Sequence, residues 1–109
     1  MRLLQLERED VVVAKGTRVN PLHHQSFKQD LIFIDADIQS QLDWALEENR
    51  NTNAMIILVK GSILQIMRDY KVRIYFDQNG FLLKSFNIEA VPARVSQEGD
   101  LLKIEELVI

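Results

Sequence analysis

Few side chains in this chain combine a reactive type with a useful spacing. The 109 residues contain no cysteine, which excludes disulfides, thiolate nucleophiles and Cys-ligated zinc. His23 and His24 are neighbours whose side chains point apart, and no third ligand follows at helical or hairpin spacing. Gly61-Ser62 lacks the lysine and further glycine of a phosphate-binding loop, so we expect a turn and a helix cap there. We therefore predict neither a cofactor nor a metal site.

Two carboxylates, Asp35 and Asp37, directly follow the apolar run Leu31–Ile34. Asp35-Ala-Asp37 resembles the Asp-x-Asp opening of haloacid-dehalogenase-type phosphatases. That resemblance implies attack on phosphorus by the first carboxylate, acid catalysis by the second and bound Mg²⁺, and Ser62 would suit the phosphate contact. Such enzymes usually have a larger core, a lysine and a second acidic pair, for which only Asp77 is a candidate. A small Mg-dependent phosphoryl-transfer enzyme is thus the alternative, whereas the preferred interpretation is Asp37 as a helix N-cap in a protein that is not an enzyme.

Length and composition favour one globular domain, with 47% hydrophobic and 27% charged residues. The formal net charge is −3 and the 13 basic residues are scattered, so we predict no nucleic-acid partner. No apolar run approaches the roughly 20 residues that span a bilayer, which argues against direct membrane insertion. Residues 1–10 carry five charges, too many for the core of a signal peptide.

The hydrophobic pattern predicts alternating strands and helices followed by a hairpin. The expected strands are Leu31–Ile34, Met55–Val59, Arg73–Phe76, Val91–Ser96 and Leu101–Leu107, and the expected helices are Gln39–Arg50, a segment capped by Ser62 that ends near Tyr70, and Gly80–Phe86. Such an order predicts an α/β mixed sheet, with parallel strands plus a C-terminal antiparallel hairpin, flanked by helices. Asn87 stands where a left-handed helix cap is common, and a turn is expected at Glu98-Gly99.

The chain divides into an N-terminal extended segment, residues 1–28, and a domain that spans residues 29–109. We expect a charged lead-in at residues 1–10, then a short extended piece at Val11–Val13. Turns are expected at Lys15-Gly16 and Asn20-Pro21, because the residue before a proline is pushed out of the helical region.

Aromatic side chains divide into core and surface candidates. On an ideal helix, Trp44 lies about 70° from the apolar stripe centred near Leu42 and Ala45, which predicts a half-exposed position. Such a tryptophan either anchors an interface or only caps the margin of the core. The remaining large rings are expected in the core: Tyr75, Phe76, Phe81 and Phe86.

Four sequence blocks and a Val-Pro-Ala segment occur in the order and spacing of TraW, a conjugal transfer protein family of F-type type IV secretion systems. The blocks are Lys15–Leu22, Leu31–Asp35, Met55–Ser62 and Arg73–Gln78, and the similarity covers about residues 11–107. The resemblance implies a periplasmic protein for pilus assembly that associates with the pilin-assembly protein TrbC and other conjugation-apparatus proteins. TraW chains begin with a secretory signal and a longer N-terminal region, so we expect this chain to be a C-terminal portion or a mature fragment.

The segment Asp77–Gly80, a helix and Phe86–Val95 also resemble the last part of the thioredoxin fold, where a loop delivers a cis-proline beside the active-site helix. This resemblance implies that the mixed sheet of residues 29–109 is a thioredoxin-like domain. It also implies that Val91-Pro92 is cis and that Asp35–Gln39 stands in place of the redox motif. Without cysteines, disulfide exchange is excluded. Either a docking surface for an extended peptide remains there or the region is only a conformational relic of the fold. A degenerate thioredoxin-like peptide-binding chaperone is a further alternative. The predicted protein-binding residues are Ala36, Asp37, Ile38, Trp44, Val91 and Pro92.

Overall fold

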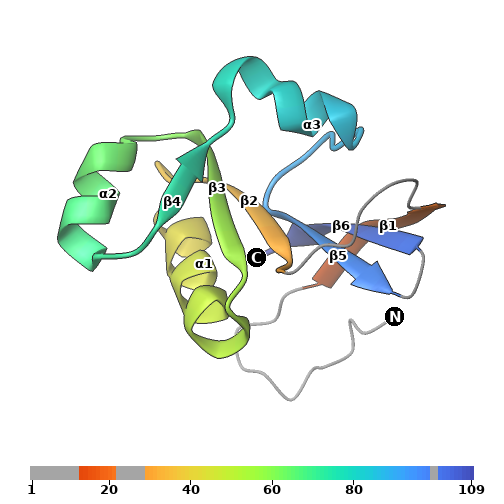
Figure 1. Cartoon of the computed structure of the whole chain (residues 1–109), viewed down its shortest axis with the longest axis horizontal. Helices are drawn as coiled ribbons and strands as arrows, with labels where there is room; N and C mark the ends of the chain where they lie inside the picture. Colours follow the sequence, from red (N-terminus) through yellow and green to blue (C-terminus); the bar gives the residue numbers. More distant parts are fainter. Residues whose placement is uncertain (1–12, 22–28, 99–100) are drawn as a thin grey trace.

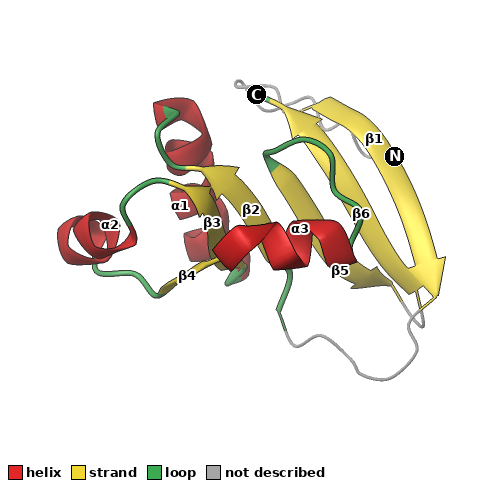
Figure 2. Cartoon of the chain, turned by 90° about the horizontal axis from the view of Figure 1, so that it is seen from above, coloured by secondary structure: helices red, strands yellow, loops and turns green. Residues whose placement is uncertain are grey.

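A computed structural model describes residues 13–21, 29–98 and 101–109, and within these ranges the chain forms one sheet with helices on both sides (Figures 1 and 2). The strands are β1 (Val13–Pro21), β2 (Leu31–Asp35), β3 (Met55–Lys60), β4 (Ile74–Phe76), β5 (Ala93–Glu98) and β6 (Leu101–Val108). The helices are α1 (Gln39–Thr52), α2 (Ile63–Tyr70) and α3 (Phe81–Ser85), the last preceded by a 3-10 turn, η2 (Gln78–Gly80).

The six strands lie in the order β1-β6-β5-β2-β3-β4. Strands β2, β3 and β4 are parallel, as expected for strands joined through the helices α1 and α2. Strand β5 runs antiparallel to β2, and β6 runs antiparallel to β5 and β1. The predicted fold class, an α/β mixed sheet with a C-terminal antiparallel hairpin, is confirmed. Gly99 of the predicted hairpin turn lies outside the described residues.

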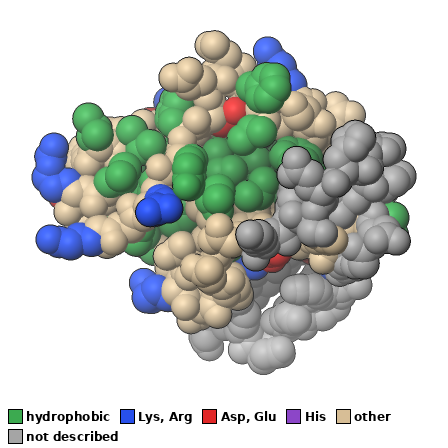
Figure 3. Space-filling model, viewed as in Figure 1, with side chains coloured by type: hydrophobic (Ala, Val, Ile, Leu, Met, Phe, Trp, Pro, Cys, Tyr) green, Lys and Arg blue, Asp and Glu red, His purple; other side chains and the backbone are tan. Residues whose placement is uncertain are grey.

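An apolar cluster fills each face of the sheet, because the central strand β2 is apolar on both sides as predicted. Ile32 and Ile34 point to the face that α1 and α2 cover, whereas Phe33 points to the face that carries α3. In Figure 2 the first two helices lie on one side of the sheet and α3 on the other. Since α3 has only five residues, it covers only part of its face, and hydrophobic side chains remain visible there in Figure 3.

Trp44 is buried, with 6% of its surface exposed, so the expectation of a half-exposed interface anchor is wrong. The buried arc of α1 is wider than the apolar stripe suggests and extends to Gln41 and Glu48. Both polar residues contact the hairpin region: Gln41 bonds Val91, and Glu48 forms an ion pair with Arg94. Burial of this wide arc explains why Trp44 joins the core.

Three of the four aromatic residues predicted for the core are exposed instead. Tyr75 and Phe76 are 42% and 43% exposed because β4 has three residues and lies at the sheet edge. Phe81, the first residue of the short α3, is 69% exposed. Phe86 packs against the α3-side cluster, where its ring meets that of Phe33 edge-on at 6.2 Å between centroids.

A nearly buried arginine joins three elements that are distant in sequence. Arg94 points away from the α3-side cluster, and its Nη2 lies 2.7 Å from Asp30 Oδ2. The guanidinium also pairs with Glu48 and donates to Thr52 Oγ1 at 3.0 Å. Its side chain is only 15% exposed, so this network ties β5 to α1 beneath the helix.

The N-terminal extended segment contains a longer strand than expected. Strand β1 continues through Gly16 and Asn20, so the two turns predicted within it are wrong. A register shift between Ala14 and Gly16 absorbs the extra residue as a bulge, and Pro21 ends the strand, where a missing N–H costs little. The predicted lead-in at residues 1–10, Val11, Val12 and the pair His23-His24 lie outside the described residues. Among those described, no helix is both long and apolar enough to cross a membrane.

Candidate functional site

The turn from β2 into α1 positions the two candidate carboxylates. Asp35 Oδ1 accepts a hydrogen bond from the Asp37 N–H at 2.9 Å, and the Asp35 N–H donates to Gln41 Oε1 at 2.9 Å. Helix α1 starts after Ile38 without a side-chain cap, so the prediction that Asp37 caps it is wrong. The Asp37 carboxylate instead lies at the surface, 3.9 Å from Lys60 Nζ.

The Val91-Pro92 peptide bond is cis, as predicted. Gln41 Nε2 donates to the Val91 carbonyl at 3.4 Å, and the Leu107 N–H donates to the Pro92 carbonyl at 2.8 Å. The Gln41 side chain is buried, with 7% of its surface exposed. From this position its hydrogen bonds link the end of β2 to the proline loop. Both carbonyls of the cis dipeptide thus already have partners within the chain.

The predicted protein-binding residues do not form one exposed patch. Ala36 packs against the α1-side cluster and Val91 against the α3-side cluster, while Pro92 is buried. Asp37 and Ile38 are exposed, Ile38 by 45%. Ala36 and Val91 thus pack against different clusters, and a docking role for this region stays a prediction.

The residues of the alternative phosphoryl-transfer site have structural roles. Asp77 is 4% exposed, and its two carboxylate oxygens accept from the N–H groups of Leu82 and Leu83 at 2.8 and 3.0 Å. Ser62 Oγ accepts from the Gln65 N–H at 3.3 Å, which confirms the predicted cap of α2.

Asn87 adopts the predicted left-handed conformation, with φ of 60°. Across the described ranges, no group of three or more His, Cys, Asp or Glu side chains could hold a metal ion.

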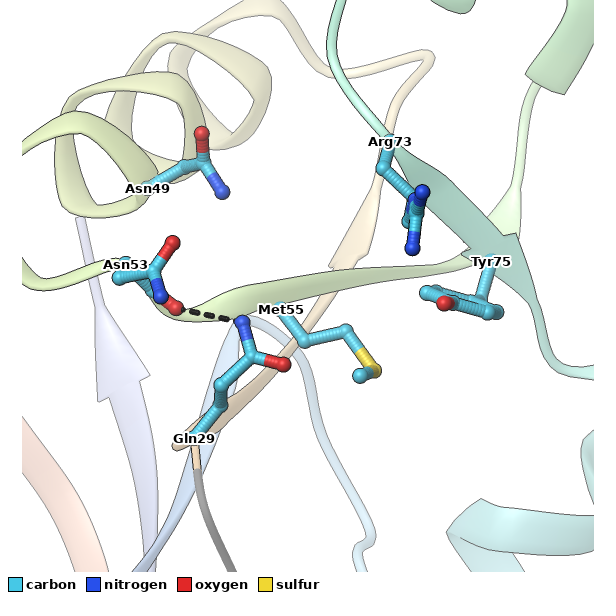
Figure 4. Close-up of a pocket in the computed structure, with 6 residues that line it drawn as sticks. All are labelled: Gln29, Asn49, Asn53, Met55, Arg73 and Tyr75. Atoms are coloured by element: carbon cyan, nitrogen blue, oxygen red, sulfur yellow. Dashed lines mark hydrogen bonds between the residues drawn. The ribbon is translucent and has the colours of Figure 1, made fainter.

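A pocket of about 250 Å³ lies at the opposite end of the parallel strands, where β3 and β4 begin (Figure 4). It is lined by Gln29, Asn49, Asn53, Met55, Arg73 and Tyr75. Two of the side-chain amides that line it donate hydrogen bonds to backbone carbonyls. Gln29 Nε2 donates to Asn53 O and Asn49 Nδ2 donates to Ala54 O, both at 2.8 Å. The Arg73 guanidinium and the Tyr75 hydroxyl have no partner in the part of the chain that the structure describes. We call this site the Arg73 pocket.

The Arg73 pocket was not predicted from the sequence because Tyr75 was assigned to the core. The missed signal is the two-residue spacing of Arg73 and Tyr75, which places both side chains on one face of a strand. A charged neighbour on the same face indicates a partly solvated position. The pocket also needs Asn53, the left-handed C-cap of α1, whose proximity depends on tertiary structure.

No protein-family model matches this chain, and no solved structure matches it significantly. Protein TraW of Escherichia coli strain K12 is 42% identical over 98 residues, which cover 87% of this chain. The match covers 47% of that protein, so the chain spans about half the length of its curated relative. Over the region that aligns, this chain belongs to the TraW family.

Proposed function

We propose that this chain is a non-catalytic protein-binding module of an F-type conjugation apparatus, a type IV secretion system. In this proposal it acts in the periplasm, in pilus assembly, with a TrbC-like pilin-assembly protein and other conjugation-apparatus proteins. The observation that carries the proposal is the 42% identity to TraW over 87% of the chain.

The local chemistry supports a binding role over a catalytic one. The chain has no thiol. Of the candidate groups, Asp77 accepts from backbone N–H groups in the first turn of α3 and Ser62 caps α2. Asp35 holds the turn that follows its strand. Each of these groups has a partner that stabilises the fold, which is the pattern of a structural scaffold.

A chimaeric protein tests the conjugation role. The matching stretch of Escherichia coli TraW is replaced by this chain in a donor strain that lacks TraW, and plasmid transfer is counted. We expect transfer to recover towards the level given by intact TraW. A chimaera that accumulates normally and yet leaves transfer at the level of the deletion strain would contradict the proposal.

A binding assay and an enzyme assay test the finer statements. We expect purified TrbC to be retained by this chain and not by an unrelated domain of similar charge. Phosphatase activity is measured with Mg²⁺ for the wild-type chain and for Asp35→Asn. Turnover that requires the metal and disappears in Asp35→Asn would establish the enzymatic alternative and overturn the non-catalytic assignment.

A further inference from the structure

We propose that the Arg73 pocket is a docking site for a segment of a partner protein that carries an acidic side chain between apolar residues. The proposal rests on the proposed function only for the identity of the protein that supplies this segment. Three properties of the pocket support it: a cation that pairs with no described residue, an apolar wall and the charge of its surroundings.

The cation is Arg73, the charged group that lines the pocket. Its side chain is exposed and forms no ion pair within the described ranges. In Figure 4 it points to the same space as Tyr75 and Met55. A guanidinium presents N–H donors in a planar fork that matches a carboxylate, so an acidic side chain suits this position.

The apolar wall consists of Met55 and Tyr75. Tyr75 is 42% exposed, and Met55 is half-buried against the α3-side cluster. Figure 3 shows hydrophobic side chains over the middle of the sheet, on the face that α3 covers in part, and the cluster that Met55 joins lies on this face. Because the apolar surface extends beyond the pocket, a bound segment would have apolar residues beside its carboxylate. We therefore assign an internal acidic side chain to the pocket and not a chain terminus.

The surrounding charge favours an acidic partner and disfavours a second copy of the chain. Residues 68–73, from the end of α2 to the start of β4, contain three cations, Arg68, Lys71 and Arg73, and a single anion, Asp69. The whole chain, by contrast, has a formal net charge of −3. Figure 3 shows Lys and Arg side chains along the side that carries α2 and β4. Two copies meeting through this basic region would repel each other, whereas an acidic segment would be attracted.

The test uses a synthetic peptide, acetyl-Val-Tyr-Glu-Val-Leu-amide, and a matched peptide with Gln in place of Glu. Binding to the isotope-labelled chain is followed by NMR. We expect shifts at the amides of Met55, Arg73 and Tyr75, and about fivefold weaker binding of the Gln peptide. No shifts at millimolar peptide, equal binding of both peptides, or shifts centred on Ile38 would overturn the proposal.

Variants test whether the peptide binds at the Arg73 pocket or is attracted only by the basic charge of the surrounding surface. Arg73→Glu should weaken binding of the Glu peptide by about fivefold or more, while Arg68→Glu, on α2, should change it less than about twofold. Tyr75→Ala is the second variant and Tyr70→Ala its control, since the two tyrosines are 42% and 44% exposed. Equal loss in Arg73→Glu and Arg68→Glu would overturn the site.

The same variants distinguish this proposal from the proposed function. If TrbC binds the wild-type chain, and binds Arg73→Glu and Arg68→Glu equally well, the docking site is wrong and the proposed function stands. If TrbC does not bind the wild-type chain, the proposed partner fails and the peptide result decides the docking site. Binding to phosphatidylglycerol vesicles that depends on Arg73, without peptide shifts, would reassign the surface to membranes and overturn the proposal.

Discussion

The two ends of the parallel strands differ in how their polar groups are used. At the end where β2 finishes, Gln41 bonds Asp35 and Val91, and the Pro92 carbonyl accepts from Leu107. At the end where β3 and β4 begin, Arg73 and Tyr75 have no partner among the described residues. The polar groups beside the cis-proline, at the closed end, are thus satisfied by internal contacts, whereas the Arg73 end, the open end, presents donors that no described residue accepts. This difference directs the search for a partner surface to the Arg73 end.

The closed end depends on the close approach of Gly61 to Ala36. A Cβ on Gly61 would lie 2.7 Å from the Ala36 Cβ, and Gly61 has a φ of +118°. We expect Gly61→Ala to lower the free energy of unfolding by about 3 kcal/mol, measured by urea unfolding.

Gly80→Ala is the matched control for this substitution. Gly80 also has positive φ, at +66°, but nothing lies within 4 Å of an added Cβ. We expect a loss of about 1 kcal/mol from the backbone conformation alone. Equal losses at the two glycines would show that the contact with Ala36 is not tight.

Gln41 provides the hydrogen bonds that close the proline loop. Its replacement by alanine leaves the Asp35 N–H and the Val91 carbonyl without these partners. We expect Gln41→Ala to cost about 2 kcal/mol in urea unfolding. Gln39→Ala should cost less than about 0.5 kcal/mol, because Gln39 is exposed and its side chain bonds only Asp43 among the described residues. A Gln41→Ala variant as stable as Gln39→Ala would contradict the closed-end description.

Tyr75 should matter for binding more than for stability. It is exposed at the sheet edge, so Tyr75→Ala should lower the free energy of unfolding by less than about 1 kcal/mol. Binding of TrbC, measured by calorimetry, should weaken by about tenfold because an aromatic anchor is lost. Tyr70→Ala should leave affinity within about twofold. If both tyrosine variants bind TrbC with wild-type affinity, the open end is not the binding surface.

Ile38 should give the smallest effects. Its side chain is 45% exposed at the start of α1, so Ile38→Ser should change stability by less than about 0.5 kcal/mol. TrbC affinity by calorimetry should not change measurably. A loss of affinity in Ile38→Ser would revive the docking patch predicted beside the cis-proline.

Much of the fold could be predicted from the sequence, because its apolar runs and its cap and turn residues are clear. The apolar runs of β2 and β3, the Ser62 cap and the left-handed Asn87 follow from local rules. The cis bond at Pro92 followed from the resemblance to thioredoxin-like proteins. These features depend on short segments whose physical requirements are visible in the sequence.

The burial of the misassigned residues depends on which strands lie at the edges of the sheet and on how much of each helix surface is buried. Tyr75 and Phe76 are apolar, and only the position of β4 at the end of the sheet makes them exposed. Trp44 lies off the apolar stripe, but it is buried in the α1-side cluster on the arc of α1 from which Gln41 and Glu48 contact the hairpin region. The Arg73 pocket likewise requires that Asn53, after α1, and Tyr75, on β4, line the same space.

Photo-crosslinking from matched surface positions compares the two ends of the sheet most directly. A photoreactive phenylalanine analogue is placed at Tyr75 or at Ile38, which are 42% and 45% exposed, in donor cells that produce TrbC. We predict an adduct with TrbC from position 75 and none from position 38. An adduct from position 38 with none from position 75 would contradict the assignment of the open end as the binding surface.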